Sequence, residues 1–164
     1  MRFLALPAAF ALLPLALASC GSSGGHAAKP GLGGAIGVGN TPGAVIARHF
    51  RNELEGNLGE AWNDLYPGHR ALISRKRFEA CFRPVTNGAK VTSITVIAVT
   101  DEPIHIPEVT EKKSKAVMWI IDTSRGSAVD SDTGTSHAVK AGGRWYWVLS
   151  EGAVKRVEAG RCPA

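Results

Sequence analysis

Apolar and polar residues follow a helical period in the middle of the chain and a strand period after it. Beyond residue 41, apolar residues recur at intervals of three and four, which places them on one face of a helix. Thr41-Pro42 and Ser74 are typical helix starts, and Pro67-Gly68 is predicted to end a helix. The pattern predicts helices over 42–54, 58–65 and 74–82.

The character of the sequence changes after position 90, where β-branched residues dominate. Ile104-His105-Ile106 stands between two prolines and reads as an edge or bulge, and Asp132-Thr133-Gly134 as an irregularity within a strand. The connections are short, which requires antiparallel pairing. Helices followed by strands predict an α+β fold, with N-terminal helices packed on an antiparallel sheet of about four strands. The predicted strands cover 91–100, 115–123, 127–140 and 144–150.

The first twenty residues form a pattern of their own. Arg2 precedes an apolar run over 3–17. This run is too short to span a membrane, which takes about 20 apolar residues, and its length is typical of the apolar part of a signal peptide. Leu17-Ala18-Ser19-Cys20-Gly21 resembles the lipobox of bacterial lipoproteins, where the cysteine receives diacylglycerol and becomes the first residue. The resemblance implies a signal peptide over 1–19 and lipidation of Cys20. An ordinary secretory signal is the alternative.

The lipobox resemblance also implies where the protein works. Lipid on Cys20 would anchor it at the extracytoplasmic face of the cell membrane, with the membrane as its first partner. Residues 20–41 comprise this cysteine and a Gly- and Ser-rich segment, which cannot bury enough apolar surface to fold and is expected to be a flexible tether. The folded domain is therefore expected over 42–164.

Two of the three cysteines remain once Cys20 is lipidated. Pairing is the default in an oxidising compartment, so a disulfide between Cys81 and Cys162 is predicted, with free thiols as the alternative. Neither cysteine lies in a C-x-x-C motif, which leaves a redox or zinc role without support.

The formal net charge of the chain is +5, and part of the excess is local. A basic surface outside the membrane could contact anionic lipid headgroups or wall polymers, whereas nucleic acid is not expected as a partner there. A solvated helix face is the favoured alternative. The basic residues in question are Arg70, Arg75, Lys76 and Arg77.

Three segments resemble the nuclear transport factor 2-like superfamily. They are N-L-G-E-A-W-N-D-L-Y-P at 57–67, S-R-K-R-F-E-A-C-F at 74–82 and A-G-G-R-W-Y-W-V-L at 141–149. The resemblance extends over about 42–150 and implies a bent sheet wrapped around a long helix as an open cone. It also implies dimerisation through the sheet face, which relatives commonly show.

Some members of that superfamily are isomerases or dehydratases, which place an acid, a histidine or a tyrosine in the cone. An Asp base with a Tyr donor would suit proton abstraction beside a carbonyl, because an apolar pocket raises the pKa of a carboxyl group. Asp122 stands at a strand end, however, where an acid is usually solvated, and no metal-ligand or nucleophile motif occurs. No catalytic role, metal or cofactor is expected. The candidates are Tyr66, His105, Asp122, His137 and Tyr146.

The aromatic residues of the last strand have two interpretations. Alternation places Trp145 and Trp147 on one face and Tyr146 on the other, and Trp119 could join either set. Packing in the core against the first helix is favoured. The alternative is an aromatic-lined pocket for a small apolar ligand, formed by these four residues with the polar candidates above.

Three functions follow from these expectations. The first is a non-catalytic, membrane-anchored binding module for a small apolar ligand or an envelope protein. The second is a structural module that forms a homodimer. The third, least favoured, is an enzyme of the isomerase or dehydratase type.

Overall fold

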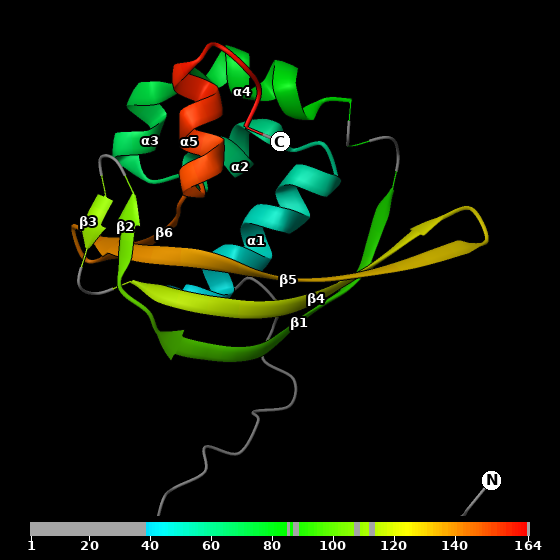
Figure 1. Ribbon diagram of the computed structural model, residues 1–164. Coiled ribbons are helices and arrows are strands. Elements are labelled where there is room, and N and C mark those ends of the chain that lie inside the picture. Colours follow the sequence, from blue (N-terminus) through cyan, green and yellow to red (C-terminus); the bar gives the residue numbers. More distant parts are fainter. Residues whose placement is uncertain (1–38, 85, 87–88, 107–108, 112–113, 164) are drawn as a thin grey trace, which may run out of the picture.

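The computed structural model of the protein describes residues 39–84, 86, 89–106, 109–111 and 114–163. Within these ranges, four helices precede the main sheet and a fifth follows it (Figure 1). The helices are α1 Pro42–Leu54, α2 Leu58–Asp64, α3 Pro67–Leu72, α4 Arg75–Phe82 and α5 Glu151–Glu158.

The main sheet is antiparallel throughout, and its four strands lie side by side in the order in which they occur along the chain. Two short strands, β2 Ile104–Ile106 and β3 Val109–Glu111, pair with each other apart from it. The sheet curves beneath α1, and the shorter helices gather on the same side (Figure 1). The predicted α+β class, with helices on a four-stranded antiparallel sheet, is confirmed. Its strands are β1 Lys90–Asp101, β4 Lys115–Arg125, β5 Ala128–Ala141 and β6 Arg144–Trp147.

Helix α1 begins where the sequence predicts. The Ala44 N–H donates to Thr41 Oγ1 at 3.2 Å, and Pro42 occupies the first turn, where its missing N–H costs no helical hydrogen bond. The buried face of α1 packs on strands β4 and β5 to form one of the core clusters, through Val45, Ile46, Val117 and Ala138.

Pro67 begins a helix, although the sequence predicted that Pro67-Gly68 would end one. Helix α2 already ends at Asp64, the next residue has an extended backbone, and Pro67 is the first residue of α3. Proline fits this position because its fixed φ angle suits a first helical turn.

Helix α5 was not predicted, because the last strand was expected to continue to residue 150. Strand β6 ends at Trp147, and the Ala153 N–H donates to Ser150 Oγ at 3.2 Å to cap α5. Val154 and Val157 of α5 are buried in the largest core cluster, so tertiary packing stabilises a helix of only eight residues.

The predicted irregularity at Asp132-Thr133-Gly134 is absent, since the register of β4 with β5 runs without a shift from Lys115 to Arg125. Gly134 has a different role. A Cβ atom there would lie 2.6 Å from Trp119 Cζ2, so the glycine gives the indole ring room to lie across β5.

The predicted disulfide is confirmed. Cys81 of α4 is bonded to Cys162, with 5.4 Å between their Cα atoms. The same tail is also held by Arg77, whose Nη2 donates to the Arg161 carbonyl oxygen at 2.8 Å. The C-terminal segment is therefore fastened to α4 at two points.

Candidate functional site

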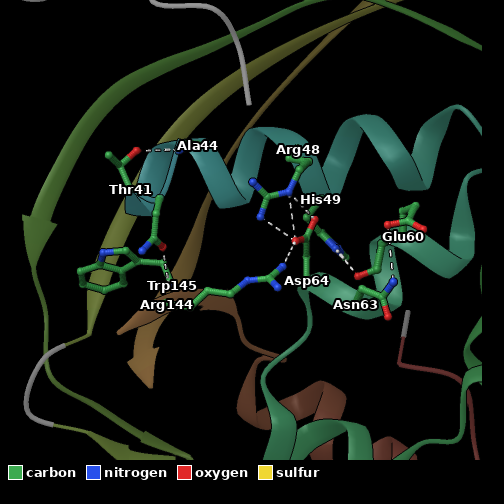
Figure 2. Close-up of polar contacts among 11 residues, drawn as sticks. Thr41, Ala44, Arg48, His49, Glu60, Asn63, Asp64, Arg144 and Trp145 are labelled. Atoms are coloured by element: carbon green, nitrogen blue, oxygen red, sulfur yellow. Dashed lines mark hydrogen bonds and ion pairs between the residues drawn. The ribbon is translucent and has the colours of Figure 1, made fainter. Parts of the chain in front are cut away.

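A buried carboxylate ties α1, α2 and β6 together beside the sheet (Figure 2). Asp64 is 2 % exposed, and Arg48 donates to both of its carboxylate oxygens, with Nη2 at 2.6 Å from Oδ1. Arg144 Nη2 lies 3.2 Å from the same Oδ1. Two guanidinium groups thus compensate a single buried charge, as a buried carboxylate requires.

His49 lies one residue further along α1 and is fully buried. Its ring stacks on Trp147, with 3.8 Å between the ring centroids and 18° between the planes. Nδ1 lies 3.2 Å from the Ala61 carbonyl oxygen and must carry a proton to donate to it. On the other side, Nε2 lies 3.1 Å from Glu53 Oε2. Nε2 makes no hydrogen bond within the described residues, so the two groups form an ion pair only when the imidazole carries a second proton.

Two cavities adjoin this end of α1 and share Phe50 and Glu53. The first, called here the apolar cavity, has a volume of about 300 Å³ and is lined mainly by apolar residues of α4, β6 and the C-terminal segment. The second, called the acidic cavity, has a volume of about 570 Å³ and lies over β4 and β5. Distinctive lining residues are Phe82, Trp147 and Pro163 in the first, and Trp119, Asp130 and Asp132 in the second.

The structure divides the predicted pocket residues between these cavities and the rest of the fold. His137 and Trp147 line the apolar cavity, and Trp119 lines the acidic cavity. The remaining five line neither of the two: Tyr66, His105, Asp122, Trp145 and Tyr146. The predicted pocket is therefore not a single site.

The tryptophans of the sheet pack on the core, which is the favoured interpretation, and Trp119 and Trp147 also line cavities. Trp119, Trp145 and Trp147 all pack on the core cluster formed with α1, as expected for core residues. Trp119 also meets Phe50 with 4.7 Å between centroids, at the wall of the acidic cavity. Tyr146 instead lies under guanidinium groups, with Arg144 Cζ 5.2 Å and Arg70 Cζ 5.9 Å from its ring centroid.

The acid–base candidates do not converge. Asp122 accepts from Ser93 Oγ at 2.5 Å, and the hydroxyl groups of Ser93 and Ser131 lower its pKa from the ordinary value of 3.8, in contrast to a carboxyl group in an apolar pocket. His137 Nε2 lies 3.2 Å from Glu102 Oε1, and His105 is exposed on β2. In the described part of the chain, no hydrogen bond or ion pair joins any two of the five candidates.

The basic residues between 70 and 77 have mostly intramolecular roles. Arg70 lies over the Trp62 ring at 5.1 Å, and Arg75 Nε lies 2.7 Å from Glu79 Oε1. Arg77 holds the C-terminal segment, as described above. Lys76 is exposed. This geometry favours a helix surface engaged with its own fold over a site for anionic polymers.

Sequence reasoning missed His49, Glu53 and Asp64. The spacing of His49 and Glu53, four residues apart on a predicted helix, would have indicated their contact. Nothing local could indicate that Arg144 reaches Asp64, because 80 positions separate them.

The described residues contain no group of three or more His, Cys, Asp or Glu that could hold a metal ion. None of the helices they form is long and apolar enough to cross a membrane. The predicted signal peptide and the lipidation of Cys20 lie outside the described residues and stay predictions.

No protein-family model matches the chain, and no curated protein matches it. Among solved structures, a SEC-C motif containing protein from Rhodopseudomonas palustris is similar at 17% identity, with a TM-score of 0.46 over 66% of this chain and 75% of that one. A second SEC-C motif containing protein, from Psychrobacter arcticus, is similar at 14% identity, with a TM-score of 0.43 over 64% of this chain and 56% of that one.

These comparisons correct the predicted family. The assignment of the domain to the nuclear transport factor 2-like superfamily is wrong, since the similar solved structures are SEC-C motif containing proteins. Nothing in these structures supports a lipoprotein, so lipidation of Cys20 stays a prediction from its own motif. The segments that carried the resemblance are short, and a helix pair followed by an antiparallel sheet produces such patterns in many chains. The likeness to the solved structures is itself distant and indicates no ligand or activity for this chain.

Proposed function

We propose that this protein is a non-catalytic binding module for a small apolar ligand, which occupies the apolar cavity. The proposal is based on the residues that line the apolar cavity. Phe50, Phe82 and Trp147 line a space of about 300 Å³, together with aliphatic residues and Pro163. This volume is at the lower end of the range of about 300–1,000 Å³ typical of ligand pockets, which are mainly apolar with few polar groups.

The polar contacts around the cavity support binding over catalysis. Glu53 Oε2 lies 3.1 Å from His49 Nε2, and His137 Nε2 lies 3.2 Å from Glu102 Oε1, but neither histidine nitrogen makes a hydrogen bond. Within the described residues, no third ionisable side chain forms a salt bridge with either pair. A carboxylate beside aromatic walls is suited to orienting a ligand.

The proposal includes a place of action outside the cytoplasmic membrane. The Cys81–Cys162 disulfide supports it, because such bonds persist in oxidising compartments. Acylation of Cys20 would hold the module at the membrane surface. Cys20→Ala should then release the protein from membranes or leave it unprocessed, and a Cys20→Ala protein of mature size in the membrane fraction would refute this part.

Calorimetric titration with naphthylmethanol, a small neutral aromatic ligand, tests the binding proposal. Ala153 lines the apolar cavity from α5, and Ala153→Phe should fill it and abolish binding. Ala80 is exposed on α4, so Ala80→Phe is the matched control and should bind normally. Equal binding by both variants, or no binding by the unaltered protein, would refute the proposal.

A homodimer is the second candidate, and the outer strand of the sheet favours it. β1 is an edge strand of 12 residues, and three of its apolar side chains are exposed by 37–51%. Such an edge can pair with another strand. Concentration-dependent dimerisation that is lost when Ile97 is replaced by lysine would support this candidate.

A further inference from the structure

We propose that the ligand is an organic cation: its apolar body occupies the apolar cavity and its ammonium group lies in the acidic cavity beside Glu53. This inference rests on the proposed binding function and names the chemical class of the ligand. Phe50 and Glu53 line both cavities, so the cavities are neighbours at this end of α1, and the inference places one ligand across the two residues.

The charge of the acidic cavity is opposite to that of the whole protein. Three carboxylates line it, from Glu53, Asp130 and Asp132, against one guanidinium group from Arg125. The chain as a whole carries a formal charge of +5. Among the described residues, no salt bridge involves Asp130 or Asp132. These carboxylates are therefore available to a positively charged ligand, and they would repel an anion.

The C-terminal end of α1 also favours a positively charged ligand in the acidic cavity. Leu54, the last residue of this 13-residue helix, also lines the acidic cavity. The carbonyl groups of a helix C-terminus form the negative end of the helix dipole, which stabilises cations nearby. The Glu53 contact with His49 involves Oε2, and no salt bridge among the described residues involves Oε1, so Oε1 can accept a hydrogen bond from a ligand.

Aromatic rings in the acidic cavity suit an ammonium group in particular. Phe50 and Trp119 meet there with 4.7 Å between their centroids and 55° between their planes. Ring faces attract cations, and the attraction strengthens in a partly desolvated site. The described carboxylates are not grouped to ligate a metal ion, so an organic cation fits this cavity better than a metal does.

Three naphthalene derivatives of nearly the same shape test the inference on the full chain: naphthylmethylammonium, naphthylmethanol and naphthoate. We expect the ammonium ligand to bind about tenfold more tightly than the alcohol, as for a half-buried ion pair, and naphthoate to bind most weakly. The indole N–H resonance of Trp119 should shift with the ammonium ligand more than with the alcohol.

Glu53→Gln and Asp132→Asn should each reduce the preference for the ammonium ligand over the alcohol. Asp132 lines only the acidic cavity, so its variant should bind naphthylmethanol as the unaltered protein does. Asp132 is exposed, so its variant should fold even if Glu53→Gln does not. Glu158→Gln is the control, because it removes the same charge at an exposed position on α5, and it should retain the preference for the ammonium ligand. Equal binding of ammonium and alcohol would overturn the inference and leave the proposed function standing, whereas no binding of any of the three would overturn both.

Discussion

Replacing Gly134 with alanine should destabilise the protein, although alanine is normally better than glycine within a strand. The added Cβ would lie 2.6, 2.9 and 3.2 Å from three atoms of the Trp119 ring, where about 3.5–4.0 Å is the preferred separation. The ring would have to move by about 1 Å. Trp119 is held by a hydrogen bond from Nε1 to Ser136 Oγ at 3.0 Å and by its contact with Phe50.

The size of the effect follows from two opposing terms. Overpacking of this kind costs about 1–3 kcal/mol, because either the ring or the strand must shift. Replacing glycine within a strand contributes about 0.5–1 kcal/mol in the opposite direction. The difference lies between about 0 and 2.5 kcal/mol, so we expect Gly134→Ala to lower the free energy of unfolding by about 1 kcal/mol.

Equilibrium unfolding in urea measures the change, and a second background identifies its cause. In a Trp119→Leu protein the ring is gone, so the same Gly134→Ala change should be neutral or stabilising. If alanine at this position stabilises the unaltered protein, or costs the same in both backgrounds, the proposed role of Gly134 as a space for the indole ring is wrong.

Three further predictions concern the polar and covalent links. Asp64→Asn should lower the free energy of unfolding, measured in urea, by about 2 kcal/mol. The effect should be smaller than for a fully buried pair, because the Arg48 and Arg144 side chains are 32% and 49% exposed, and an unchanged value would show that these ion pairs do not stabilise the fold. Replacing both Cys81 and Cys162 by serine should lower the free energy of unfolding by up to about 4 kcal/mol in the same assay, because the disulfide closes a loop of 81 residues. If a reducing agent does not change the stability of the unaltered protein, this prediction is wrong. Because serine hydroxyls lower the pKa of Asp122 in the folded protein, the contribution of Asp122 to stability is present above pH 3.8 and is lost as the pH falls through the lower, folded-state pKa. Ser93→Ala should raise the Asp122 pKa in an NMR titration. An unchanged pKa would show that the Ser93 hydrogen bond is not the cause of the shift.

Local sequence signals predicted much of the fold. The Thr41-Pro42 start of α1 depends on a side chain that caps backbone N–H groups three residues away, so no distant contact is needed. The same holds for Ser74, whose Oγ accepts from the Arg77 N–H at the start of α4. The disulfide followed from cysteine count and compartment. Such features depend on near neighbours or on simple counting, which one sequence contains in full.

The predictions that were wrong concern positions where the local sequence is compatible with two different structures. Proline suits the first turn of a helix as well as the end of one, so Pro67 could not distinguish them. Ser150 and Glu151 carried a usable helix-start signal, but an eight-residue helix depends on the burial of Val154 and Val157, which the tertiary fold supplies. The family resemblance rested on short segments of the same kind.

The sequence by itself determined that helices precede an antiparallel sheet, the faces of α1 and β6 and the pairing of two cysteines, because periodicity, local capping and cysteine count decide them. It did not determine α3 or α5. Only the tertiary structure decided which side chains meet. It brought Arg144 to Asp64 across 80 positions and stacked His49 on Trp147. It also placed Phe50 and Glu53 between two cavities. Such contacts depend on how α1 crosses the curved sheet, and packing of the whole domain sets that geometry.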